Sequence, residues 1–125
     1  DTEVLVHGYE KWCLSLFKKL RGMFAIALWD CRNRQLVLAR DPFGEKPLYW
    51  TMNKGTFVFG SEAKVVLRHP DVKKEIDVKS LQKYLIFEYV PTPQTIYKGI
   101  NRLKPAHYAV WKDGVMKEYP YWSIL

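Results

Sequence analysis

Apolar and polar positions divide the chain into helix-like and strand-like stretches. Over residues 2–20, apolar side chains recur at the spacing of one helix face, and Gly22 ends the pattern. We expect a helix there, with Asp1 and Thr2 both acceptable as the N-cap residue. From residue 21 to residue 62, short apolar runs alternate with polar or glycine-containing breaks, which is typical of strands joined by tight turns.

The strand expected over residues 23–30 is apolar on both of its faces. Phe24, Ile26 and Leu28 alternate with Ala25, Ala27 and Trp29. A strand with two apolar faces is usually buried between layers. Residues 31–34 then form a polar connection to a second strand over residues 35–39, and residues 48–51 and 56–60 read as a hairpin.

The second half of the chain predicts two helices, an extended connector and a final hairpin. We expect a short helix over residues 62–68 capped by Ser61, and a helix over residues 78–87 capped by Asp77, with Leu81, Tyr84 and Leu85 as its apolar stripe. Pro91 and Pro93 prevent a helix over residues 89–93, and we expect residues 89–105 to be an extended connector. Residues 106–122 form a terminal hairpin that turns at Asp113-Gly114 and ends in an aromatic cluster.

Composition indicates a globular chain and limits its partners. The 125 residues are 48% hydrophobic and 26% charged, which excludes a disordered tail. The net charge is +7, but the basic residues are scattered without a stripe, so we expect no nucleic-acid partner. No apolar run approaches the ~20 residues that cross a bilayer, so we expect no membrane partner and a cytoplasmic location. Cys13 and Cys31 are too few for a disulfide framework, and we expect them to be reduced.

The loop after the second strand holds a group of charged residues. Arg40 and Asp41 are followed by Pro42, Gly44 and Lys46, and a further acid, Glu62, comes later in the chain. The two prolines at positions 42 and 47 cannot donate to a ladder, so this segment must turn. The charges read either as a catalytic cluster or as an ion-paired loop that fixes the rim of the sheet, and we favour the second interpretation.

The sequence of this loop resembles a known family signature. RDPFGEKPLY at residues 40–49 is similar to the RDxFGxKPLY motif of the glutamine amidotransferase domain of asparagine synthetases, a branch of the N-terminal-nucleophile (Ntn) hydrolases. The resemblance continues, in order, through DTEV at 1–4, LRGMFA at 20–25, GSEAK at 60–64, YVP at 89–91, TIYKGI at 95–100 and LKPAHY at 103–108.

The resemblance implies a fold, a reaction and roles for particular residues. The fold would be α+β, part of a four-layer αββα Ntn-hydrolase sandwich with mostly antiparallel strands. The intact protein would hydrolyse glutamine through a cysteinyl thioester and pass ammonia to an ATP-activated aspartate. Asp1 would bind the α-amino group of glutamine through a charge-assisted hydrogen bond. Arg40, Asp41, Gly44, Lys46 and Glu62 would support the site structurally without taking part in the chemistry.

The same resemblance implies that residues 1–125 are the C-terminal portion of a single glutamine amidotransferase type 2 domain. The family uses an N-terminal cysteine whose own α-amine is the base. The sequence begins with Asp1, and Cys13 and Cys31 are internal, so we expect the nucleophile upstream, no catalytic residue in this chain and no glutaminase activity from it alone. The synthetase domain, in cis, would follow downstream and bind ATP and magnesium. No metal site is legible here, because His7, His69 and His107 are separated from one another and from the cysteines.

Three alternatives stay open on the sequence alone. One reading makes the chain a non-catalytic amidotransferase-like interaction module, and another makes it the glutaminase half of a different amidotransferase. A third reading makes Thr2 a new N-terminal nucleophile after removal of Asp1. If the upstream half of the sandwich is missing, the strand over residues 23–30 cannot be covered on both faces, and we expect the chain to self-associate.

Overall fold

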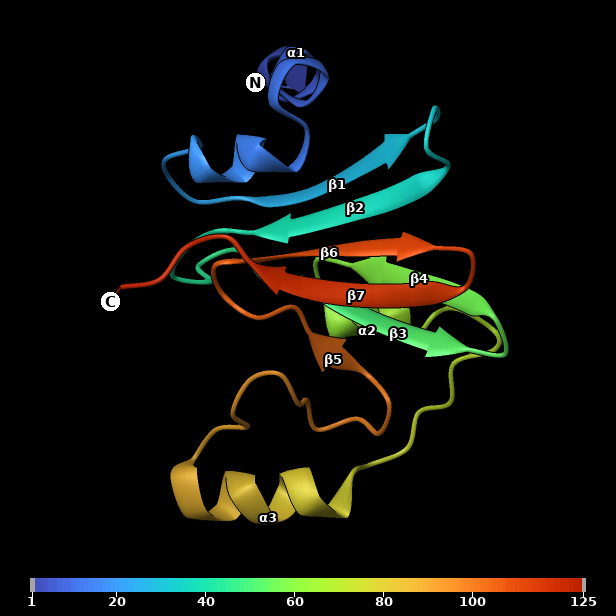
Figure 1. The fold of residues 1–125 in the computed structure, drawn as a ribbon. Helices are drawn as coiled ribbons and strands as arrows, with labels where there is room; N and C mark the ends of the chain where they lie inside the picture. Colours follow the sequence, from blue (N-terminus) through green and yellow to red (C-terminus); the bar gives the residue numbers. More distant parts are fainter. Residues whose placement is uncertain (1, 125) are drawn as a thin grey trace.

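A computed structural model describes residues 2–124 of the chain, and Figure 1 shows its elements in order along the sequence. Helical segments frame two groups of antiparallel strands. They are α1 (Thr2–Trp12), the 3-10 helix η1 (Cys13–Lys18), β1 (Ala25–Asp30), β2 (Gln35–Arg40), β3 (Tyr49–Asn53), β4 (Thr56–Gly60), α2 (Ala63–Val66), α3 (Val78–Phe87), β5 (Asn101–Arg102), β6 (His107–Lys112) and β7 (Val115–Pro120).

The strands form two sheets in which every neighbouring pair is antiparallel. The larger sheet has the order β1-β2-β6-β7, and the smaller has the order β4-β3-β5. Three tight hairpins join β1 to β2, β3 to β4 and β6 to β7, as the sequence predicts. The hairpin β6–β7 returns next to β2, so the last part of the chain completes the sheet that the first strands begin.

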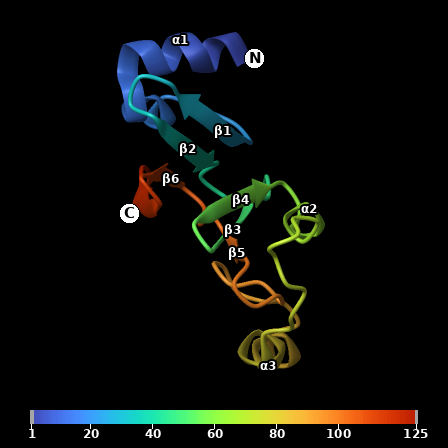
Figure 2. The same ribbon diagram turned by 90° about the vertical axis from the view of Figure 1, so that its right-hand side faces the viewer.

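The elements lie in successive layers, which Figure 2 shows from the side. The helices α1 and η1 cover one face of the larger sheet, and the smaller sheet packs on its other face. Beyond the smaller sheet lie α2, which packs against β3 and β4, and α3. The α+β class and the antiparallel sheets are therefore confirmed, and the layers follow the helix–sheet–sheet–helix order of the expected sandwich.

Two buried clusters hold these layers together. Between the helices and the larger sheet, the buried residues are Phe17, Ile26, Val37, Ala39 and Tyr121. Between the two sheets they are Leu38, Leu48, Leu103 and Ala109. Because side chains alternate along β2, Val37 and Ala39 join the first cluster while Leu38 joins the second. The strand β2 is therefore buried on both faces and lies at the centre of the domain.

Two expectations for the first thirty residues are wrong. The helix predicted over residues 2–20 is interrupted at Cys13, whose φ is +48°, and continues as the 3-10 helix η1. The strand β1 is not buried on both faces: Ile26 is buried, but Ala25, Ala27 and Trp29 are exposed. Within the described residues, the smaller sheet covers β2 and β6 but leaves this face of β1 open.

The second half follows the prediction with smaller corrections. Asp77 caps α3 by accepting a hydrogen bond from the Lys79 N–H, as expected. In contrast, α2 is shorter than predicted and begins after Glu62, with no side-chain cap from Ser61. The connector over residues 89–105 includes the short strand β5 and a cis peptide bond between Thr92 and Pro93.

The apolar stripe expected on α3 is largely open to solvent. Leu81, Tyr84 and Leu85 are all exposed, and Leu85 retains 73% of its accessible surface. Ser80, which donates to the Asp77 carboxylate at 2.7 Å, is the buried residue of this helix. No helix in the described part of the chain is long and apolar enough to cross a membrane.

Candidate functional site

The loop that follows β2 is organised around the Arg40 side chain. Its guanidinium donates three hydrogen bonds to backbone carbonyls: to Lys46 at 2.8 Å, to Leu103 at 2.7 Å and to Gly44 at 2.5 Å. Only 6% of Arg40 is exposed. Burial lowers the pKa of Arg40, while the neighbouring Asp41 carboxylate acts in the opposite direction. One side chain therefore joins both ends of the loop to the segment before β6.

Asp41 complements Arg40 by binding the backbone N–H groups of the same loop. One carboxylate oxygen accepts from Phe43 at 3.1 Å and Glu45 at 2.9 Å, and the other accepts from Lys46 at 2.9 Å. Burial, which leaves the residue 1% exposed, raises the pKa of Asp41, but the backbone donors outweigh it and hold that pKa below its ordinary value. The carboxylate is thus ionised and fully engaged in fixing the turn.

The backbone of Asp41 extends this arrangement to both neighbouring segments. Its N–H donates to the Phe24 carbonyl at 2.9 Å, and its carbonyl accepts from the Ala106 N–H at 2.9 Å. Gly44 completes the turn at φ +68°, a conformation that residues with a Cβ resist. A Cβ there would lie 2.8 Å from Pro105 Cγ and 3.0 Å from Arg40 Cζ, so glycine is also required for space.

The loop is held by hydrogen bonds to backbone, and the ion pairs expected from sequence are not present among the described residues. Lys46 contributes its backbone carbonyl and N–H to the network, but its side chain is exposed and has no described ion-pair partner. Glu62 lies at the start of α2, where its carboxylate pairs with Lys64 Nζ at 2.7 Å. The structure therefore brings together Arg40, Asp41 and Gly44 and places Glu62 elsewhere.

A cavity of about 370 Å³ opens beside this loop. Its floor includes Tyr121, which is 7% exposed and donates through its hydroxyl to the Arg40 carbonyl at 2.6 Å. Burial raises the pKa of the Tyr121 phenol, so the hydroxyl remains a donor. Sequence reasoning placed Tyr121 in a terminal aromatic cluster but missed this bond. The lining residues are Phe17, Lys18, Leu20, Arg21, Gly22, Pro42, Phe43, Glu45, Tyr121 and Trp122.

A second polar network, also missed from sequence, ties α1 to the β1–β2 hairpin. Asp30 accepts from the Tyr9 hydroxyl at 3.0 Å, from the Asn33 N–H at 2.9 Å and from the Asn33 amide at 2.8 Å. These bonds, those from Asn33 first, lower the pKa of Asp30 to about 2. Burial is the main cause that raises the pKa of Tyr9 to about 12. The sequence signal for this network is Asp30, an acidic residue at the end of a strand and directly before a polar turn.

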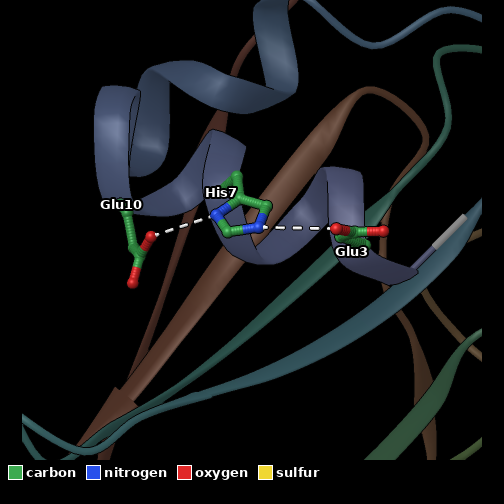
Figure 3. A network of polar contacts seen from close by, with 3 residues as sticks. All are labelled: Glu3, His7 and Glu10. Carbon is green, nitrogen blue, oxygen red and sulfur yellow. Dashed lines mark hydrogen bonds and ion pairs between the residues drawn. The ribbon is translucent and has the colours of Figure 1, made fainter.

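The residue expected to bind substrate, Asp1, lies outside the described residues. The first turns of α1 that follow it carry an exposed network, which Figure 3 shows. His7 Nε2 lies 3.8 Å from Glu3 Oε1, and His7 Nδ1 lies 3.3 Å from Glu10 Oε2. Exposed pairs of this kind contribute little to stability, and all three side chains face solvent. They are surface pairs of an amphipathic helix.

The two cysteines are free thiols at exposed positions. Cys13 follows α1 and Cys31 begins the β1–β2 turn, and both line a cavity of about 320 Å³ between these elements. Neither has the α-amine that an N-terminal nucleophile uses. Among the described residues, no three His, Cys, Asp or Glu side chains are grouped so that they could hold a metal ion.

Comparison with known proteins identifies the class to which this arrangement belongs. The sequence model of the glutamine amidotransferase domain matches residues 1–122. The chain therefore belongs to the glutamine amidotransferase domain family.

The chain is similar to several curated proteins. It is 38% identical over 125 residues to asparagine synthetase (glutamine-hydrolyzing) 3 of Bacillus subtilis, covering 99% of this chain and 20% of that protein. It is 41% identical over 112 residues to a putative asparagine synthetase (glutamine-hydrolyzing) of Mycobacterium tuberculosis, covering 87% of this chain and 17% of that protein. Amidase chyE of Penicillium rubens is 32% identical to the chain over 125 residues, covering 99% of this chain and 18% of that protein. The chain thus spans about a fifth of the length of these relatives.

Proposed function

We propose that the chain is part of the glutaminase domain of an asparagine synthetase. The observation that carries the proposal is the family match over residues 1–122 together with 38% identity to an asparagine synthetase along almost the whole chain. The hydrogen-bonded loop at residues 40–47 supports the proposal, because Arg40, Asp41 and Gly44, which fix the shape of the loop, are residues that it shares with the family signature. As part of an Ntn-hydrolase sandwich, this loop would hold the strands around the glutamine pocket in register.

In the reaction we propose, a cysteine thiolate of the complete domain attacks the side-chain carbon of glutamine. Ammonia leaves, and a thioester to the cysteine remains, which water hydrolyses to glutamate. The ammonia then replaces the leaving group on an ATP-activated aspartate. ATP and magnesium belong to the synthetase domain in this proposal, and the complete protein would work in the cytoplasm. Glutamine is bound through Asp1, whose carboxylate would pair with the α-ammonium group.

Within residues 1–125, we propose structural roles for Arg40, Asp41 and Gly44 and no catalytic role for either cysteine. Arg40 and Asp41 direct all their described hydrogen bonds to backbone groups of the loop and its neighbours, which leaves neither free to transfer a proton. Cys13 and Cys31 are exposed and internal. We therefore expect the 125-residue chain alone to release no glutamate from glutamine.

Two assays test these statements. The complete protein encoded by the gene should release glutamate from glutamine and, with aspartate and ATP-magnesium, form asparagine. Glutamate without asparagine would favour another amidotransferase or an amidase, which the 32% identity to amidase chyE makes the second candidate. If neither glutamate nor asparagine forms, the remaining candidate is a non-catalytic interaction module. For the 125-residue chain, glutamate release that disappears in Cys13→Ser or Cys31→Ser would contradict the assigned roles.

A further inference from the structure

A polar network anchors the middle of α1 to two strands of the larger sheet. Asp30 and Gln35 lie opposite each other at the end of the β1–β2 pair. The Tyr9 hydroxyl donates to Asp30 Oδ2 at 3.0 Å and accepts from Gln35 Nε2 at 3.1 Å. Asp30 is held in turn by two donors of Asn33, the backbone N–H at 2.9 Å and the side-chain amide at 2.8 Å. One hydroxyl of α1 is therefore bound by side chains of both strands.

Apolar contacts also hold α1 against the domain. Leu5 and Tyr9 pack on the buried cluster between the helices and the larger sheet. Gly8 lies so close to η1 that a Cβ there would come within 2.6 Å of Leu16 Cδ1. Contacts of this kind are non-directional, so they press the helix onto the sheet without fixing its rotation about its own axis. The hydrogen bonds of the Tyr9 hydroxyl are directional and supply that restraint.

The protonation states of the two partners favour this restraint at neutral pH. The hydrogen bonds to Asp30, those from Asn33 first, lower its pKa to about 2, so its carboxylate is an ionised acceptor. Burial is the main cause that raises the pKa of Tyr9 to about 12, so its hydroxyl keeps the proton that it donates. A hydrogen bond to an ionised acceptor is about twice as strong as one between neutral groups. The bond between α1 and β1 is therefore of the stronger kind.

The position of α1 matters because the residue proposed to bind glutamine directly precedes this helix. Asp1 lies outside the described residues, but it is bonded to Thr2, the first residue of α1. Any rotation or shift of α1 therefore moves the point at which the chain leaves Asp1. Tyr9 comes seven residues after Thr2, which is about 10 Å along a helix. The helix is thus a rigid arm between the network and the proposed glutamine ligand.

One strand carries both the support of α1 and the loop over residues 40–47. Gln35 is the first residue of β2 and Arg40 is the last. Between them, Val37, Leu38 and Ala39 are buried. Buried central strands are the elements that open only when the whole domain unfolds. The strand β2 therefore gives the network a rigid base.

We propose that Tyr9 and Asp30 are positioning residues for glutamine binding. Their hydrogen bond fixes the rotation of α1 and thereby places the Asp1 carboxylate against the α-ammonium group of glutamine. The inference rests on the proposed function, which gives Asp1 that role. A misplacement of about 1 Å can lower a rate by about 10²-fold. Loss of the Tyr9 hydroxyl leaves the apolar contacts of α1 in place, so we expect a smaller loss of about tenfold.

Two substrates separate this positioning role from a merely structural one. Ammonia release by the complete protein would be measured with glutamine and with glutaramate, which is glutamine without its α-amino group. Tyr9→Phe should lower kcat/KM for glutamine by about tenfold, mainly through a higher KM, because the pairing with Asp1 holds the substrate before and during reaction. For glutaramate, which has no ammonium to position, the loss should stay below about twofold. Tyr119→Phe, at an exposed position of β7, is the matched control and should resemble the parent with both substrates.

Further variants make the failures distinguishable. Asp1→Ala should show the same selectivity, and adding Tyr9→Phe to it should cause little further loss, because both changes act on one interaction. Equal losses with the two substrates, or parent-like kinetics of Tyr9→Phe, would overturn the positioning role while Asp1→Ala remains selective. If Asp1→Ala is not selective, or if the parent releases no ammonia from glutamine, the proposed function fails and the positioning role with it. Asp30→Asn, which removes the charge of the acceptor, decides in the same way if Tyr9→Phe does not fold.

Discussion

Replacing Arg40 by methionine should destabilise the fold more than any other single change to a charged residue of the loop. Methionine keeps the unbranched apolar stem but removes all three donors to Gly44, Lys46 and Leu103. The loop carbonyls of Gly44 and Lys46 can regain water, whereas Leu103 is 0% exposed and its carbonyl has lost a buried donor. Leaving a buried acceptor unsatisfied costs about 1–3 kcal/mol, and bonds from a charged donor contribute about 1.5–3 kcal/mol each. We expect a loss of about 3 kcal/mol.

Urea unfolding followed by tryptophan fluorescence below 1 µM measures this loss without a contribution from association. With a urea dependence of about 2 kcal/mol per M, the midpoint should fall by about 1.5 M. The urea midpoint of Arg40→Lys should lie between those of the parent and of Arg40→Met, because an ammonium group cannot donate to three separate carbonyls as the guanidinium does. Arg32→Met, at an exposed turn position, is the control and should stay within about 0.5 kcal/mol of the parent. A midpoint for Arg40→Met within about 0.3 M of the parent would refute the organising role of the guanidinium.

Three further changes probe the same loop. Asp41→Asn should lower the unfolding free energy by about 2 kcal/mol, since an NH₂ group then faces backbone N–H donors. Because the folded-state pKa of Asp41 is lowered, the stabilisation by its carboxylate is full above about pH 4 and is lost as the pH falls through that lower pKa. The unfolding free energy of the variant should therefore depend less on pH in the acid range than that of the parent. Gly44→Ala should lower the melting temperature clearly more than Gly55→Ala, which also has a positive φ but open space around it; equal effects would show that crowding by Pro105 and Arg40 is unimportant. Lys46→Ala should change the unfolding free energy by less than about 0.5 kcal/mol, because the side chain is exposed, and a larger loss in urea would reveal a partner for its ammonium.

The strands could be predicted from sequence because local patterns determine them. The apolar run of β2, the alternation along β6 and the turn residues between strands specify the hairpins, and Asp77 marks the start of α3. The local pattern does not show which other elements pack on each face of a strand. The apolar residues on both faces of β1 indicated burial between layers, yet the described part of the chain covers the Ile26 face alone.

The loop shows a similar limit for charged residues. The sequence places Arg40, Asp41 and Lys46 in one loop and Glu62 in a later motif, and pairing of opposite charges is the simplest expectation. The structure instead satisfies Arg40 with carbonyls and Asp41 with N–H groups, because a tight turn exposes many unpaired backbone groups in a small space. The contact with Leu103, 63 residues away, depends on the return of the chain and leaves no local signal.

Transfer of a label between amides tests the proposed function most directly. The complete protein, supplied with glutamine labelled with nitrogen-15 in its side-chain amide, aspartate, ATP and magnesium, would be followed by nuclear magnetic resonance. We expect asparagine labelled in its side-chain amide, formed together with glutamate. Unlabelled asparagine, or no asparagine while glutamate accumulates, would contradict the assignment of this chain to an asparagine synthetase.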